Sequence, residues 1–306
     1  MKISEAIRQF LEHCEIEKNQ SKRTLISYKH YLERFLGFSG DIEIEKIDQD
    51  LARRFRLHLN RLEPKKNQTL DIKTQNYHMI ALRAFLKYCA KRDWKTLAAE
   101  KVDLAKIPGR TVEYLSREEL ERLFAAIDTS KITGLRDRAI METLYSTGLR
   151  ISELVALNRQ SVDLDRGEFY VRGKGKKVRI VFLSERAKTW ILDYLDSRED
   201  GFDPLFINHG RTRRKKEGDL DLKGEHRRFT EYSIQEIARL TALRAGITKH
   251  VTPHTLRHSF ATELLINGAD IRSVQELLGH SSITTTQIYT HITNKKLKEV
   301  HERFHR

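Results

Sequence analysis

Residues 252–289 read TPHTLRHSFATELLINGADIRSVQELLGHSSITTTQIY, the most specific pattern in this chain. His254 and Arg257 lie three residues apart at the start of an apolar helical pattern, so their side chains can face one target. His280 closes the tripeptide LGH, and Tyr289 ends the stretch. Guanidinium and imidazole groups suit an anionic, tetrahedral target such as a phosphodiester. A tyrosine beside them is a candidate nucleophile.

Patterns of other catalytic sites are missing around this stretch. The sequence has no nearby Ser/His/Asp arrangement, no glycine-rich loop with the spacing of a phosphate-binding loop, and no cysteine spacing typical of a metal site. His254 and His258 have the i, i+4 spacing of a zinc-binding pair, but no third ligand is evident. We therefore expect no metal at this site.

The charge of the chain points to a polyanionic partner. The 306 residues carry a formal net charge of +14, and residues 1–106 and 107–306 each contribute +7. An excess of positive charge in both halves suggests a polyanion held between two basic domains, although a solvated basic surface has the same composition. Hydrophobic residues make up 39% of the chain, which is enough for two folded domains.

The two cysteines and the hydropathy pattern bear on the compartment. Cys14 and Cys89 both fall among apolar helical positions, which predicts buried free thiols in a reducing compartment. The N-terminus has no uninterrupted apolar core, and no stretch approaches the length of a membrane span. The sequence thus predicts a cytoplasmic protein.

Four amphipathic patterns predict an all-α N-terminal domain over residues 1–105. The expected helices cover 3–17, 22–36, 48–62 and 71–91. Their Lys and Arg side chains can follow a DNA backbone or simply face solvent. Residues 106–113 contain a Pro-Gly pair and are the expected linker.

The pattern after the linker predicts an α+β domain over residues 114–306. Ser116 and Glu119 have the spacing of a capping box that starts a helix. The period then changes, and short strands are expected at 162–164, 168–171 and 178–183 among helices at 116–127, 135–146, 185–195 and 233–245. Residues 202–208 suggest a short strand or loop, and the charged stretch 209–228 suggests a flexible loop. The fold class is therefore mainly α with a small antiparallel β-sheet.

Two further basic residues stand at positions suited to an anion. Arg150, in TGLRISEL, follows a helix-ending glycine and begins the next helix, where free backbone amides favour negative charge. An ion pair with Glu153 or Asp137 is the alternative. Lys174, in GKGKK, is expected at a hairpin tip that can reach a DNA groove, or it is simply a solubilising turn residue.

In order along the chain, these residues resemble the catalytic set of the tyrosine recombinase/integrase family, most closely the Xer-type site-specific recombinases. The resemblance covers nearly the whole chain and implies a helical, SAM-like core-binding domain followed by a catalytic domain. The family set corresponds here to Arg150, Lys174, His254, Arg257, His280 and Tyr289. The charged stretch 209–228 looks like an insertion relative to the family.

The resemblance implies a role for each of these residues. Tyr289 attacks a DNA phosphate and forms a 3′-phosphotyrosyl intermediate, with His254 as the proton acceptor. Arg150 and Arg257 bind the non-bridging oxygens, and His280 donates a further hydrogen bond. Lys174 protonates the leaving 5′-oxygen. No cofactor is expected, because the protein–DNA link conserves the phosphodiester energy and the arginines supply the positive charge.

The resemblance also implies partners and leaves alternatives. It implies a homo-oligomer on double-stranded DNA, a tetramer in synapsis, in which the tail 294–306 docks on a neighbouring protomer. A second recombinase or a DNA translocase is an additional candidate partner. The expected function is the resolution of chromosome or plasmid dimers. A mobile-element integrase or transposase, a topoisomerase-like enzyme, and a catalytically silent DNA-binding protein are the alternatives.

Overall fold

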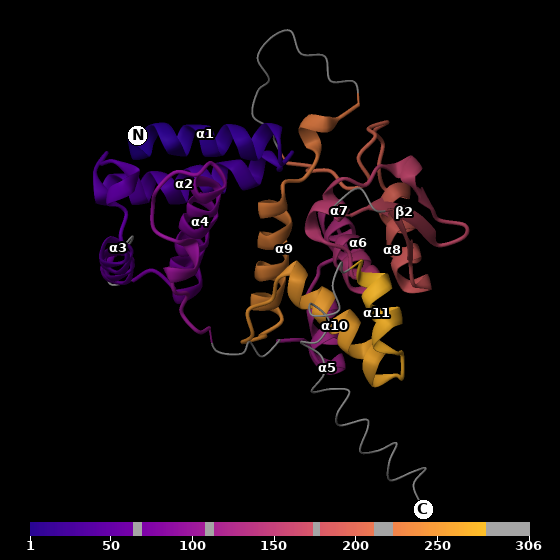
Figure 1. Ribbon diagram of the computed structural model, residues 1–306. Coiled ribbons are helices and arrows are strands. Elements are labelled where there is room, and N and C mark those ends of the chain that lie inside the picture. Colours follow the sequence, from indigo (N-terminus) through magenta and orange to yellow (C-terminus); the bar gives the residue numbers. More distant parts are fainter. Residues whose placement is uncertain (64–68, 108–112, 174–177, 211–222, 280–306) are drawn as a thin grey trace, which may run out of the picture. The chain divides into compact units, whose positions relative to one another are not determined.

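The computed structural model describes residues 1–63, 69–107, 113–173, 178–210 and 223–279. The chain divides into two compact units, Met1–Gly109 and Arg110–Arg306 (Figure 1). Within the described ranges, no helix is both long and apolar enough to cross a membrane.

The N-terminal unit is helical, as the sequence predicts. Side-chain caps explain where its helices begin, since Ser21, Asp48 and Asp71 each accept a hydrogen bond from a backbone N–H of the first turn. Two 3₁₀ turns, Ile44–Lys46 and Ala99–Lys101, complete the described secondary structure. The helices are α1 (Ile3–Ile16), α2 (Lys22–Ser39), α3 (Gln49–Arg61) and α4 (Ile72–Lys91).

Aromatic rings from all four helices fill the core of this unit. Phe35 meets Phe55 edge to face at 5.0 Å between ring centroids, and Phe10 meets Phe85 in the same way at 5.9 Å. The apolar stripes read from the sequence are thus the buried faces. Both cysteines are buried free thiols, as expected.

The C-terminal unit consists of helices around a small sheet. Ser116 and Glu119 form the predicted capping box at the start of the first helix. Two 3₁₀ turns lie at Arg159–Ser161 and Glu225–Arg227. The described elements are α5 (Arg117–Ala125), α6 (Ile132–Thr147), α7 (Ile151–Val155), β1 (Val162–Asp163), β2 (Glu168–Arg172), β3 (Val178–Phe182), α8 (Glu185–Asp196), α9 (Glu231–Arg244), α10 (Pro253–Ile266) and α11 (Ile271–Leu278).

The three strands form one antiparallel sheet in the order β1-β2-β3. The register pairs Phe169 with Val181 and Val171 with Arg179. Phe169, Val171 and Val181 are buried, so they define the inner face of the sheet. By the alternation of β3, Arg179 lies on this inner face. The strand packs against α6 and α11.

Helix α6 runs through the core of the unit and packs against α8 and α10. Its Glu142 is buried and pairs with Arg138, one turn away, and with Arg186 on α8. Helix α6 ends at Gly148, whose left-handed backbone (φ 59°) forms the C-cap that the sequence predicts.

The expectation of a flexible loop over 209–228 is wrong for the part that the structure describes. His209 hydrogen-bonds the hydroxyl of Tyr194, and Arg228 donates to the carbonyls of Val155 and Leu157 at 2.8 and 3.0 Å. These contacts join distant parts of the chain, so local charge composition does not reveal them. Residues 202–208 form isolated bridges and no named strand, and 211–222 lie outside the described residues.

Candidate active site

Arg150 is fixed at the start of α7. It is the N-cap residue of that helix, in the position that the sequence predicts. Its guanidinium donates to Glu153 Oε1 at 2.9 Å and to the carbonyl of Gly279 at 2.8 Å. The ion pair with Glu153 that the sequence allowed is therefore present, together with a second contact 129 residues along the chain. The side chain remains 29% exposed.

Arg257 occupies the first turns of α10, but its side chain is directed into the protein. The residue is only 4% exposed. Its guanidinium donates to the carbonyl of Gly148 and to that of Leu278, the latter at 2.6 Å. Thr252 caps α10 and Pro253 takes its first position, which explains why the helix begins here. His254 lies in the same first turn and is exposed.

Three arginines from three different elements meet the C-terminal end of α11. Arg179 donates to the carbonyl of Leu277 at 3.1 Å, Arg257 to that of Leu278, and Arg150 to that of Gly279. The last carbonyls of a helix lack intrahelical partners and carry the negative end of its dipole, so cations are favoured there. We call Arg150, Arg179 and Arg257 the arginine cluster.

Glu153 connects two members of this cluster. Its carboxylate accepts four hydrogen bonds of 2.8–2.9 Å, two from the Arg150 backbone and side chain and two from the Arg179 guanidinium. Burial alone would raise the pKa of Glu153, but these hydrogen bonds and the two positive charges lower the pKa to about 2. The carboxylate is thus ionised, and two arginines share its single negative charge.

The structure brings together only part of the predicted site. Arg150 and Arg257 converge on consecutive carbonyls next to His280 in the sequence, and His254 shares a helix with Arg257. Lys174, His280 and Tyr289 lie outside the described residues. Glu153 and Arg179 were not among the predicted site residues. A signal for Arg179 exists, because it is a charged residue on the inner face of a strand and needs a partner there.

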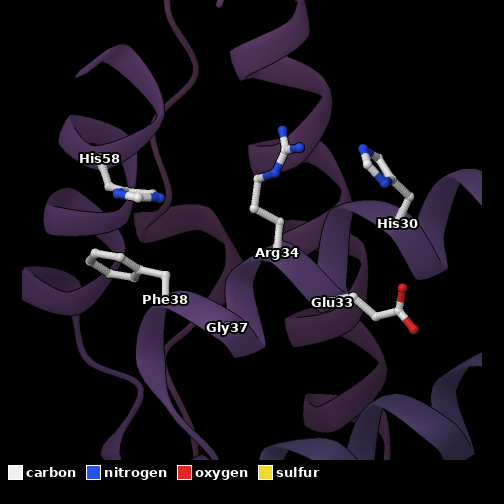
Figure 2. A pocket seen from close by; sticks show the side chains of 6 residues that line it. All are labelled: His30, Glu33, Arg34, Gly37, Phe38 and His58. Carbon is white, nitrogen blue, oxygen red and sulfur yellow. The ribbon is translucent and has the colours of Figure 1, made fainter. Parts of the chain in front are cut away.

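A surface cavity of the N-terminal unit has one arginine, one glutamate and two histidines in its lining. A cavity of about 380 Å³ between α2 and α3 is lined by His30, Glu33, Arg34, Gly37, Phe38 and His58. Figure 2 shows the Arg34 side chain between the rings of His30 and His58 in this view. Arg34 is held in place by a hydrogen bond of 3.1 Å to the buried His78 ring.

Comparison with known proteins agrees with the two-domain fold. Residues 113–296 match the phage integrase family, and residues 5–102 match the phage integrase SAM-like domain. The tyrosine recombinase XerC of Thermodesulfovibrio yellowstonii is 36% identical over 300 residues, which cover 98% of this chain and 95% of that protein. The tyrosine recombinase XerD of Oceanobacillus iheyensis is 35% identical over 309 residues, which cover 98% of both.

Solved structures share the fold. The Tn1549 transposon integrase in complex with transposon right end DNA has a TM-score of 0.74 at 20% identity, with 99% of both chains covered. The XerH site-specific recombinase bound to difH substrate, in its post-cleavage complex, has a TM-score of 0.71 at 24% identity, over 96% of this chain and 83% of that one. The family models and the relatives matched over nearly the full length show that the chain belongs to the phage integrase family and is a tyrosine recombinase, an enzyme that cleaves DNA and exchanges its strands.

Proposed function

We propose that Arg150, Lys174, His254, Arg257, His280 and Tyr289 form the active site of this recombinase. The Tyr289 oxygen forms a bond to the phosphorus, and the bond from phosphorus to the 5′-oxygen breaks. His254 takes the phenol proton, and Lys174 gives a proton to the departing 5′-oxygen. His280 donates a hydrogen bond to the phosphate. The product is a 3′-phosphotyrosyl link. A 5′-hydroxyl of the partner strand then attacks the phosphorus, forms a new phosphodiester and releases Tyr289.

The observation that carries this proposal is the convergence of Arg150 and Arg257 on the carbonyls of Gly279 and Leu278. Guanidinium groups fixed before the reaction stabilise developing charge without reorganisation. Both arginines are held by carbonyls and a carboxylate of the protein, so their positions are set. The partial exposure of Arg150 leaves its side chain within reach of a phosphate from solvent.

Double-stranded DNA is the substrate that we propose for both units. Met1–Gly109 and Arg110–Arg306 each carry a net charge of +7, and phosphate contacts supply most of the affinity of DNA-binding proteins. The cavity with Arg34, His30 and His58 is a candidate contact to the DNA backbone. We further propose a homo-oligomer on DNA, a tetramer in synapsis, a second recombinase or a translocase as additional partners, and a cytoplasmic location.

A nicked suicide duplex tests the proposal. The DNA site is first recovered by covalent capture from nicked fragments of the host genome and is then rebuilt as a duplex with a nick next to the cleavage point. Cleavage releases a short 5′-hydroxyl fragment, so the protein–DNA link cannot reverse and accumulates on a denaturing gel. We expect a covalent adduct with the unchanged chain and none with Tyr289→Phe, which should still bind the duplex. An adduct formed equally by Tyr289→Phe would overturn the assignment of the nucleophile.

A further inference from the structure

All three nitrogens of the Arg179 guanidinium donate hydrogen bonds within the protein. Nη1 and Nη2 donate to the two carboxylate oxygens of Glu153 at 2.9 and 2.8 Å, and Nε donates to the carbonyl of Leu277 at 3.1 Å. The side chain is 11% exposed. A paired arrangement of two parallel N–H···O bonds fixes the orientation of both groups as well as their distance.

These bonds join three elements that carry the proposed active site. Glu153 stands on α7 and holds Arg150, the N-cap residue of the same helix. Leu277 stands near the end of α11, two residues before Gly279, whose carbonyl is the other partner of Arg150. Arg150 and Arg179 thus share the Glu153 carboxylate, and their backbone acceptors, Gly279 and Leu277, lie two residues apart at the end of α11.

Gly279 shows how closely the end of α11 fits onto Arg179. The glycine has a left-handed backbone (φ 63°), and a Cβ atom at this position would lie 3.0 Å from both Cδ and Nη1 of Arg179. Such a distance is tighter than nine in ten Cβ contacts. The helix end thus packs directly on the arginine side chain, and the absence of a side chain at Gly279 permits this contact.

We propose that Arg179 is a positioning residue for DNA cleavage, which sets the orientation of the Arg150 guanidinium through Glu153 and through the end of α11. Arg179 does not contact the phosphate in this assignment. The inference rests on the proposed function, in which Arg150 binds the reacting phosphate. Arg179, on β3, would then affect cleavage through its contacts with Glu153 and with the carbonyl of Leu277.

The chemistry of the side chain makes the inference testable by a conservative change. Lysine keeps the positive charge but has a single nitrogen, so it cannot hold both carboxylate oxygens in the fork geometry and reach the Leu277 carbonyl as well. Arg179→Lys is therefore expected to preserve the ion pair and to loosen the orientation of Glu153. A displacement of about 1 Å in a catalytic group costs roughly 100-fold in rate.

Arg138 on α6 offers a matched control. Its side chain is 12% exposed and pairs with the buried Glu142 at 2.9 Å, which resembles the Arg179–Glu153 pair in burial and distance. Its hydrogen bonds go to Glu142 and to the carbonyl of Phe124, which belong to the core rather than to the arginine cluster. Arg138→Lys therefore measures how much stability is lost when a buried guanidinium is replaced by an ammonium group outside the arginine cluster.

The experiment measures the single-turnover rate of adduct formation by the full chain on the nicked duplex recovered as above. We expect Arg179→Lys to lower this rate by about 10- to 100-fold, with DNA affinity and melting temperature similar to those of Arg138→Lys. Arg138→Lys is expected to keep the rate of the unchanged chain.

A double-mutant cycle separates positioning from general destabilisation. If Arg179 acts through Arg150, its substitution by lysine has little further effect in an Arg150→Lys background, whereas the effects of independent residues multiply. Multiplicative effects, or equal rates for Arg179→Lys and Arg138→Lys, would overturn the inference and leave the proposed function intact. If the unchanged chain forms no adduct, the proposed function fails and this inference fails with it.

Discussion

At the scale of single residues, buried charge is balanced by shared partners. Glu153 is 6% exposed on its side chain and accepts hydrogen bonds from two arginines. Glu142 is 2% exposed and also pairs with two arginines, Arg138 and Arg186. Replacing either glutamate by a neutral residue leaves a buried guanidinium without its counterion, which lowers the free energy of unfolding. The two glutamates differ in their surroundings, since only the partners of Glu153 include a proposed catalytic residue.

We therefore expect Glu153→Gln and Glu142→Gln to lower the free energy of unfolding by similar amounts, about 3–5 kcal/mol each. Adduct formation, measured at a temperature where both variants are folded, should be slowed by Glu153→Gln because Arg150 loses its partner. Glu142→Gln should cleave at the normal rate. Equal cleavage by both variants would show that Glu153 contributes to stability only.

His209 makes the stability of the C-terminal unit depend on pH. Burial and the nearby charges of Arg136 and Arg198 lower the pKa of His209 to about 4, so the folded state favours the neutral ring. The unfolded chain binds this proton near pH 6.5, and the stabilisation is complete above that pH. It is lost as the pH falls toward 4, by no more than about 3 kcal/mol in total. Denaturant titrations at several pH values measure this loss. As the pH falls, the free energy of unfolding should decrease less for His209→Gln than for His250→Gln, a control at an exposed position.

At the scale of elements, the end of α11 is the point on which the catalytic unit converges. Strand β3, the start of α7 and the helix α10 each send one arginine to a different carbonyl of residues 277–279. Helix α11 is short, and its N-cap residue Asp270 accepts hydrogen bonds from two backbone N–H groups of the first turn. Its two ends are thus fixed in different ways, the first by a local side chain and the second by distant arginines.

Gly279→Ala should disturb this convergence more than the same change at Gly246. Both glycines have a left-handed backbone (φ 63° and 64°), so alanine costs about 1–2 kcal/mol at either position. A Cβ at Gly246 meets open space, whereas at Gly279 it meets the Arg179 side chain. Thermal unfolding should show a larger loss for Gly279→Ala, and adduct formation should fall for that variant alone. A smaller loss at Gly279 than at Gly246 would contradict the packing described here.

At the scale of the whole molecule, positive charge is divided evenly between two units. Each carries a net charge of +7, although their folds differ. An even division suits a protein that contacts DNA phosphates with both units, because the affinity then depends on many separate ion contacts.

DNA binding by the full chain should accordingly depend strongly on salt. If the two units contact between six and ten phosphates, the affinity should fall by roughly 10³- to 10⁵-fold between about 50 and 200 mM salt. Fluorescence anisotropy with the nicked duplex measures this dependence. If Arg34 contacts a phosphate, Arg34→Ala in the full chain should weaken DNA binding. It should also reduce the slope of log affinity against log salt concentration by about one ion. An unchanged slope would remove the α2–α3 cavity from the DNA interface.

The sequence by itself determined the fold class and most of the elements in their order, but it did not separate α11 from the helix before it. The apolar stripes of α1–α4, the capping box at Ser116 and the helix-ending Gly148 are local signals, and each predicts a feature that the structure contains. The same local reading placed Arg150 at a helix start and left its pairing with Glu153 open. The charged composition around Arg228 predicted a flexible loop, because composition does not reveal the distant backbone carbonyls to which this side chain donates.

Tertiary structure alone decided which groups meet. Arg150 reaches Gly279 across 129 residues, Arg257 reaches Gly148 across 109, and Arg179 reaches Leu277 across 98. No periodicity or spacing encodes such contacts, because they depend on how β3, α7, α10 and α11 pack together. The physical reason is that a buried guanidinium must find acceptors wherever the folded chain provides them, and here the unpaired carbonyls at the end of one short helix provide them.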